Sequence, residues 1–126
     1  MRLTGRVVTA WTVLISWFFV IHCFSATPAG DLPRSTIPHA DKIFHAAEYF
    51  VLGILLIRTF DMSDFKLSLA KSTVFAIIIA LSYAALDEWF QVLVPGRACD
   101  LFDFLADSAG AVTGILLYAG EKKYGR

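Results

Sequence analysis

Five carboxylic acids and one arginine lie close together in a segment that is otherwise apolar. The segment ALDEWFQVLVPGRACDLFDFLAD (85–107) contains Asp87, Glu88, Gln91, Arg97, Asp100, Asp103 and Asp107. A second segment, DKIFHAAEY (41–49), contains Asp41, Lys42, His45, Glu48 and Tyr49. Histidine and carboxylic acids exchange protons in catalysis, and carboxylates bind metal ions. The two segments therefore hold the residue types of a catalytic or metal-binding site.

Acids outnumber cations in these two segments. Lys42 and Arg97 stand against seven acids, namely Asp41, Glu48, Asp87, Glu88, Asp100, Asp103 and Asp107. That many carboxylates cannot all stay ionised in a poorly solvated site, so some carry protons or a cation compensates their charge. Three chemistries fit: a divalent cation such as Mg²⁺ or Ca²⁺, an acid/base pair of His45 and Glu48, or a cationic substrate. The sequence does not choose among them.

The composition indicates a membrane protein. The chain has 126 residues, of which 57% are hydrophobic and 17% charged, whereas soluble domains carry roughly 25% charged residues. So short a chain is expected to form one unit. The formal net charge is zero, which leaves no basic excess for nucleic acid. Membrane lipids are the partners that this composition suggests.

Hydropathy predicts an all-α integral membrane bundle of four transmembrane helices. The predicted spans cover residues 7–24, 43–57, 72–94 and 101–119, each near the length needed to cross a bilayer. The first span contains no Asp, Glu, Lys or Arg. It could alternatively be a cleaved signal peptide, but its apolar run is longer than usual and favours a retained helix.

The positive charges predict the orientation. Eight of them fall at the two termini and between the second and third spans: Arg2, Arg6, Arg58, Lys66, Lys71, Lys122, Lys123 and Arg126. Because positive residues concentrate on the cytoplasmic side, both termini are expected in the cytoplasm. The expected location is the inner (cytoplasmic) membrane, crossed several times. The loops at 25–42 and 94–101 then face outward.

The polar residues of the spans all fall at the predicted outer ends. At helical spacing, Asp41, His45 and Glu48 share one stripe. Asp87 and Gln91 continue a face formed by Ala80 and Ala84, with Glu88 turned about 100° away. Asp103 and Asp107 continue a face formed by Gly110 and Gly114. Small residues mark close helix contacts in membranes, so the acids of the third and fourth spans are expected to point into one shared pocket.

Several of these residues also have simpler structural interpretations. Asp41 could cap the second helix while Lys42 extends toward water, and Asp100 could cap the fourth. Tyr49 and Trp89 suit an interfacial aromatic belt. Cys23 and Cys99 are expected to be unpaired thiols. Glu48, Asp87 and Asp107 are harder to explain in this way, because ionisable residues inside a span are costly and usually functional.

The order and spacing of these motifs resemble the VanZ-like family, small bacterial membrane proteins named for a component of teicoplanin (glycopeptide) resistance clusters. The resemblance covers residues 38–120. It maps the family pattern onto Asp41, Lys42, His45, Tyr49, Leu52 and Gly53, then Asp87, Glu88, Gln91, Arg97, Asp103, Gly110 and Gly114. Asp107 departs from the pattern, since the family often has Asn there.

From the residues and their depth we expect a site that binds or modifies the polar headgroup of an envelope lipid or a lipid-linked cell-wall precursor. His45, Glu48 and Asp87 are the catalytic candidates. Lys42, Tyr49, Gln91 and Arg97 are the binding candidates, and Glu88, Asp103 and Asp107 the metal ligands. Two alternatives stay open: a cation- or proton-coupled transporter, and an accessory protein whose polar cluster only joins helices.

Overall fold

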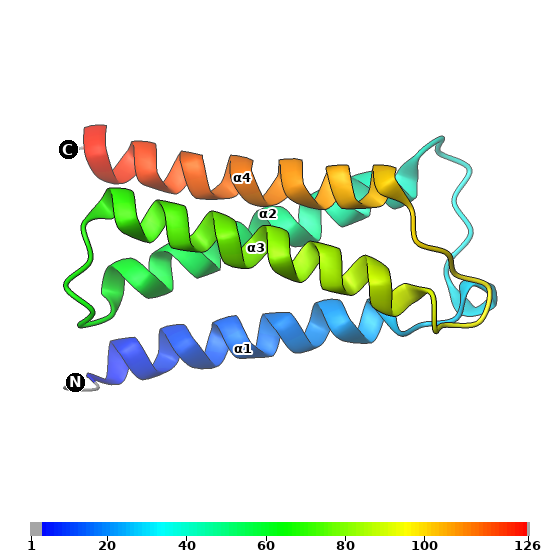
Figure 1. The fold of residues 1–126 in the computed structure, drawn as a ribbon, viewed down its shortest axis with the longest axis horizontal. Coiled ribbons are helices and arrows are strands. Elements are labelled where there is room, and N and C mark those ends of the chain that lie inside the picture. Colours follow the sequence, from blue (N-terminus) through cyan, green and yellow to red (C-terminus); the bar gives the residue numbers. More distant parts are fainter. Residues whose placement is uncertain (1–3, 126) are drawn as a thin grey trace.

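Four long helices make up almost all of the described chain. The structure, a computed structural model, describes residues 4–125. Its helices are α1 (Gly5–Ser25), α2 (Ala40–Met62), α3 (Leu69–Gln91) and α4 (Leu101–Tyr124), with one short 3₁₀ turn at Ala29–Asp31 (Figure 1). All four long helices are long and apolar enough to cross a membrane. The predicted all-α bundle of four spans is therefore confirmed.

Helices α2 and α3 have boundaries that differ from the predicted spans. Helix α2 extends beyond the predicted 43–57 at both ends, because the charged residues there continue the helix instead of ending it. Helix α3 ends at Gln91, before the predicted Val94. The next backbone N–H groups bond carbonyls three residues back, as in a tightening last turn, and Pro95 disfavours helical geometry just before it.

The helices run alternately up and down, so the bundle has two distinct ends (Figure 1). We call the end with the connections 26–39 and 92–100 the pocket end, and the end with the connection 63–68 the terminal end. Both ends of the described chain lie at the terminal end. The described positive residues of the predicted cytoplasmic side fall on elements at this end, while Arg2 and Arg126 lie outside the described residues. Which end faces the cytoplasm stays a prediction.

Helices α2 and α4 form the most extensive contact in the bundle. Three glycines make it possible, because a β-carbon at Gly53, Gly110 or Gly114 would overlap a carbonyl oxygen of the facing helix. Gly110 meets the backbone of Ala46, and Gly114 that of Phe50. Small residues let transmembrane backbones approach in this way. The expected packing face of Gly110 and Gly114 is confirmed, and it fixes the height of α4 against α2.

The middle of the bundle is apolar. Its buried side chains include Leu52, Leu56, Ala80 and Ile115, each 1% exposed or less. Large apolar side chains also cover the outside of the helices, as a lipid-facing surface requires; examples are Ile15, Phe19, Ile78 and Leu117. The charged side chains are thus confined to the two ends, as the sequence predicts for the pocket end.

Candidate functional site

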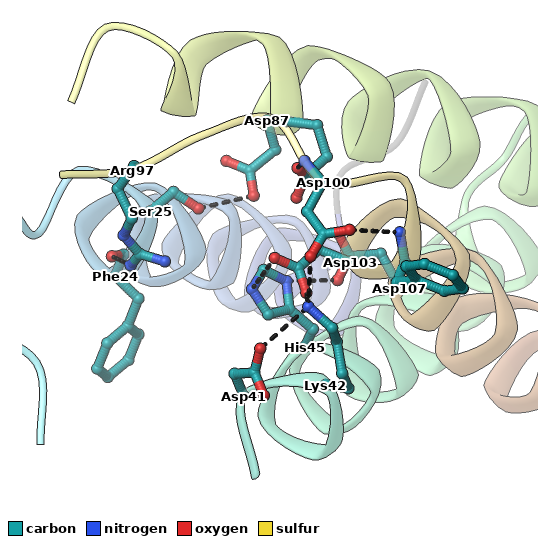
Figure 2. A network of polar contacts seen from close by, with 12 residues as sticks. Phe24, Ser25, Asp41, Lys42, His45, Asp87, Arg97, Asp100, Asp103 and Asp107 are labelled. Atoms are coloured by element: carbon teal, nitrogen blue, oxygen red, sulfur yellow. Dashed lines mark hydrogen bonds and ion pairs between the residues drawn. The ribbon is translucent and has the colours of Figure 1, made fainter. Parts of the chain in front are cut away.

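Lys42 joins three acids at the rim of the pocket end. Its ammonium lies 3.0 Å from Asp41 and 2.7 Å from Asp100, and it also bonds Asp103 (Figure 2). Two of these acids come from the start of α4, so the lysine ties α2 to α4. The interpretation of Lys42 as a side chain extending away toward water is therefore wrong, because the acids of α4 offer it a closer partner.

The two predicted helix caps have different outcomes. Asp100 caps α4, since its carboxylate accepts from the backbone N–H of Phe102 at 2.8 Å. Its hydrogen bond to Lys42 also holds the pKa of Asp100 below the usual value. Asp41 does not cap α2, because it lies inside the first turn and His39 precedes the helix with a positive φ of 57°. Asp41 instead serves as an outer partner of Lys42.

His45 lies one turn deeper than Lys42 and contacts the acids of α4. Its Nδ1 is 2.9 Å from Oδ1 of Asp107. Its Nε2 is 3.7 Å from Oδ2 of Asp103, close enough for an ion pair when the imidazole carries a proton. Asp107 is fully buried, at 0% exposed. The glycine contact between α2 and α4 lies directly below, so it sets the register that brings His45 opposite Asp107.

Glu88 is buried beside this pair, although the helical spacing places it off the face of Asp87. It is 2% exposed, and its Oε2 accepts from the backbone N–H of Asp100 at 2.9 Å. The connection 92–100 folds back over the end of α3 and covers it. Helical spacing alone could not reveal this, because the covering group comes from a loop.

Three buried polar atoms at the pocket end have no hydrogen-bond partner among residues 4–125. They are Oε1 of Glu88, Nε2 of Gln91 and Oδ2 of Asp107. All three side chains are at most 2% exposed. Buried polar atoms in folded proteins are almost always paired, and an unpaired one has a cost of about 1–3 kcal/mol. Such a concentration of unpaired atoms among the described residues leaves hydrogen-bonding or metal-binding capacity in one place.

Asp87 belongs to a separate pair of contacts, with α1 and α2. Its Oδ2 accepts from the hydroxyl of Ser25 at 2.6 Å (Figure 2). It also accepts from the hydroxyl of Tyr49 at 3.4 Å. Tyr49 is completely buried, so it lies in the bundle and not in an interfacial belt. Nothing singles out Ser25 in the sequence, apart from its being a small polar residue at the end of an apolar span.

Arg97 binds the end of α1. Its guanidinium donates to the backbone oxygens of Thr27 at 3.2 Å and Phe24 at 3.1 Å. A cation there complements the helix dipole. The carbonyl of Phe24 accepts from the backbone N–H of Thr27 as well, at 3.1 Å. Arg97 lies apart from Lys42, so the two cations predicted to act together serve different parts of the site.

A cavity of about 380 Å³ opens between these groups. Its walls come from the end of α1, the connection 26–39 and the start of α2, and they include Phe24, Leu32, Pro33, Ile37 and Phe44. The polar lining consists of Ser25, Ser35, His39, Asp41, His45, Glu48, Gln91 and Arg97. Phe24, Ile37 and Phe44 are more than half exposed. The cavity therefore combines apolar walls with a polar lining.

Glu48 differs from the other acids of the site. It is half-buried and lines the cavity with His45. Its backbone oxygen accepts from Trp17, but its carboxylate makes no hydrogen bond or ion pair with any residue between 4 and 125. A carboxylate free of partners beside an imidazole is suited to take or give a proton.

Most of the predicted site residues thus lie in three neighbouring groups: the Lys42 group at the rim, the group around His45 and Asp107 below it, and Asp87 with Tyr49. Glu48 and Gln91 line the cavity, and Arg97 lies at the end of α1. Residues that sequence reasoning missed are Ser25, His39 and the apolar walls. The connection 26–39 supplies several of them, and its extended, proline-containing sequence has no periodicity from which a facing surface could be deduced.

Comparisons with known proteins place the chain in a family. One similar protein is the uncharacterized protein C11E3.10 of the yeast Schizosaccharomyces pombe, which is 26% identical over 100 residues. The match covers 79% of this chain and 59% of the yeast protein, so the chain spans about three fifths of that relative. No solved structure matches the chain. The VanZ/LLP1 family model matches residues 6–120, and the chain belongs to this family.

Proposed function

We propose that the protein binds the polar headgroup of a membrane phospholipid in the cavity at the pocket end and acts on it. The cavity itself carries this proposal. Its exposed rim contains Phe24, Ile37 and Phe44, which suit contact with acyl chains, while His45, Glu48 and Gln91 line its polar part. A ligand that is apolar at one end and polar at the other matches such a lining.

The charges around the cavity favour a zwitterionic headgroup. Arg97 and His39 can face a phosphate, and Asp41 and Glu48 can face an ammonium group. A lipid-linked precursor with a pyrophosphate would bring several negative charges to an end of the bundle that already has an excess of acids. Like charges in poorly solvated sites repel strongly, so we favour a phosphate-ammonium lipid over such a precursor.

His45 and Glu48 are the acid and base that we assign to any reaction on the headgroup. They lie within one helical turn of each other and line the same cavity. The hydrogen bond between the imidazole and the carboxylate of Asp107 fixes the orientation of the ring, as an orienting carboxylate does in other acid/base sites. Glu48 has no competing partner, which leaves its carboxylate available to a substrate or a water molecule.

The cellular role that we propose is a change in envelope lipids. The resemblance to glycopeptide-resistance proteins fits this role, since altered lipids change the surface on which teicoplanin acts. A similar protein occurs in a yeast, an organism without peptidoglycan, which favours a general membrane lipid over a cell-wall precursor as ligand.

We place the protein in the bacterial inner membrane with the pocket end outward, on the strength of the positive charges at the terminal end. The two cysteines of the chain permit a direct test, because Cys23 and Cys99 are both exposed and lie at the pocket end. A membrane-impermeant maleimide should label them in intact cells. A variant with both cysteines changed to serine and Lys71→Cys, at the other end, should stay unlabelled; the reverse pattern would invert the orientation.

The two alternative functions receive less support. A transporter needs a polar path through the membrane, and the middle of the described bundle is filled by apolar residues such as Leu52, Leu56 and Ile115. A cluster that only joins helices is expected to satisfy its own polar atoms, whereas Glu88, Gln91 and Asp107 retain unpaired ones.

Two phenylalanines of equal exposure provide the test of lipid binding. Phe44 lines the cavity and is 68% exposed, while Phe102 lies outside its lining and is 70% exposed. We expect Phe44→Ala to weaken binding of a fluorescent phosphatidylethanolamine to the protein in nanodiscs by roughly tenfold, which is the effect of about 1.4 kcal/mol. Phe102→Ala should bind like wild type.

The competition arms distinguish the ligand classes. Unlabelled phosphatidylethanolamine should displace the probe better than phosphatidylglycerol or a polyprenyl pyrophosphate. Stronger displacement by the pyrophosphate would favour a lipid-linked precursor. Equal binding by both phenylalanine variants and wild type would refute the cavity as the lipid site.

A further inference from the structure

We propose that His45, Glu88 and Asp107 form a binding site for a divalent transition-metal ion, with Zn²⁺ as the best match. One ligand atom from each side chain lies within 4.8 Å of the other two. The residues come from α2, α3 and α4, so the site exists only in the folded bundle. This proposal does not depend on the lipid proposal, because the metal ligands are complete without a lipid.

Unpaired atoms supply an independent reason for a ligand at this position. Glu88 and Asp107 each keep one buried carboxylate oxygen without a partner. Each of them has its other oxygen engaged, by the backbone N–H of Asp100 and by His45 respectively. A cation bound to the free oxygens would satisfy both carboxylates at once.

Neither of the permanently charged side chains near the site, Lys42 and Arg97, supplies that cation. Lys42 is engaged by Asp41, Asp100 and Asp103. Arg97 donates to backbone oxygens at the end of α1. Buried carboxylates without a compensating charge are costly, by several kcal/mol for each ion. A divalent ion would compensate Glu88 and Asp107 together.

The ligand set distinguishes among metals. The oxygen-only set expected from the sequence, Glu88, Asp103 and Asp107, would suit Mg²⁺ or Ca²⁺. In the structure Asp103 bonds Lys42, and the imidazole of His45 takes its place beside the other two acids. Imidazole with carboxylates suits Zn²⁺ and related transition metals, which accept nitrogen ligands readily.

The geometry is close to what such an ion requires. With bonds of about 2.1 Å, a tetrahedral zinc ion holds its ligand atoms about 3.4 Å apart. Moving the side-chain ends by about 1 Å would close the observed spacing to that value. Three protein ligands leave at least one coordination position for water or a ligand oxygen. His45 also lines the cavity, so the ion would lie beside the bound headgroup. An imidazole that binds the ion cannot also act as acid or base, so with the ion bound that role would fall to Glu48 alone.

Metal binding to purified protein in detergent, without added lipid, tests the proposal. The protein is stripped with a chelator, dialysed, and titrated with Zn²⁺, Mn²⁺, Mg²⁺ and Ca²⁺ against a competing fluorescent chelator. We expect one Zn²⁺ per chain and weaker binding of Mg²⁺ and Ca²⁺. Glu88→Gln and Asp107→Asn should each weaken Zn²⁺ binding by at least about 100-fold, the upper range for losing even an outer partner of a ligand.

The matched control is Asp61→Asn, which removes an acid at the terminal end and should leave Zn²⁺ affinity unchanged. The proposal fails if wild type binds no Zn²⁺, if it prefers Mg²⁺ or Ca²⁺, or if folded Glu88→Gln and Asp107→Asn bind as wild type does. It also fails if Asp61→Asn weakens binding equally. Should the two site variants not fold, the visible absorption of Co²⁺ bound to wild type decides: a strong four- or five-coordinate spectrum supports the site, and a weak six-coordinate one refutes it.

If wild type binds no Zn²⁺ but Phe44→Ala still weakens lipid binding, this inference alone fails. The reverse result, Zn²⁺ binding without any effect of Phe44→Ala on lipid, would refute the headgroup proposal and leave the metal site standing. The lipid test changes Phe44 and the metal test changes Glu88 and Asp107, so the two outcomes are separable.

Discussion

The two ends of the bundle treat their acids differently. At the terminal end, Asp61 accepts from the hydroxyl of Tyr118 at 3.0 Å and pairs with Lys122 at 3.0 Å. Asp61 thus has one cation, Lys122, and one hydroxyl donor, Tyr118, to itself. At the pocket end, Lys42 and His45 contact four of the seven acids in the two polar segments, and Arg97 binds backbone oxygens instead. The described residues leave three buried atoms there unpaired.

This difference separates a structural polar group from a functional one. A polar contact that serves only the fold tends to be fully satisfied, as Asp61 is. Ser72, near the terminal end, is an exception whose hydroxyl oxygen is buried without a partner, but a single neutral hydroxyl has a modest cost. The pocket end concentrates carboxylates instead, which is the arrangement expected where a ligand completes the site.

The unsatisfied end is held in place by the tightest part of the fold. Gly110 and Gly114 bring α4 onto the backbone of α2 one to two turns below His45 and Asp107. Close backbone packing provides stability that does not depend on the polar residues above it. The fold can therefore tolerate costly groups at the pocket end.

The largest effect is expected from a methyl group in that packing. Gly110→Ala would place a β-carbon against the backbone of Ala46, where neither helix can yield locally. We expect a loss of about 3 kcal/mol in the free energy of unfolding. Gly120→Ala meets open space near the terminal end and should stabilise the helix by about 0.5–1 kcal/mol. Unfolding in mixed detergent micelles measures both; equal effects would contradict the close contact.

A smaller difference is expected between the two lysines. Lys42 is 24% exposed and serves three acids, whereas Lys122 is 56% exposed and serves one. Breaking a buried pair costs about 3–5 kcal/mol, and the partial exposure of Lys42 reduces this to roughly 2 kcal/mol for Lys42→Ala. Lys122→Ala should cost less than about 1 kcal/mol. The same unfolding assay applies, and a greater cost at Lys122 would reverse our view of the two ends.

The smallest effect is a pH dependence at the rim. Lys42 lowers the pKa of Asp100 below its ordinary value of 3.8, so the ionised form is favoured in the folded protein. The resulting stabilisation is present above about that pH and is lost as the pH falls through the lower folded pKa. Asp100→Asn keeps a good helix cap and removes only the charge. The difference in melting temperature between it and wild type should be present at pH 7 and shrink in acid; a constant difference would contradict the pairing.

Much of the fold follows from local sequence. Four apolar runs define the helices, because a span without internal hydrogen bonds is too costly in a bilayer. The depth of the acids also follows, since their positions near span ends are a matter of counting residues at helical rise. Gly110 and Gly114 also indicated a packing face, because small residues four positions apart lie on the same side of a helix.

Partners across helices were not predictable in this way. That Lys42 bonds Asp103 while His45 takes Asp107 depends on the register between α2 and α4. The burial of Glu88 depends on a loop that folds over it, and the role of Arg97 on the end of α1 lying within its reach. Such contacts join residues up to about 70 positions apart, where helical periodicity carries no information.

The sequence by itself determined that acids, histidine and lysine gather at one end of a four-helix membrane bundle, because hydropathy and helical rise fix depth residue by residue. Only the tertiary structure decided which acids are paired and which are left unpaired. The physical reason is that a hydrogen bond requires two atoms within about 3 Å, and that condition depends on how the helices and the connecting loops pack together.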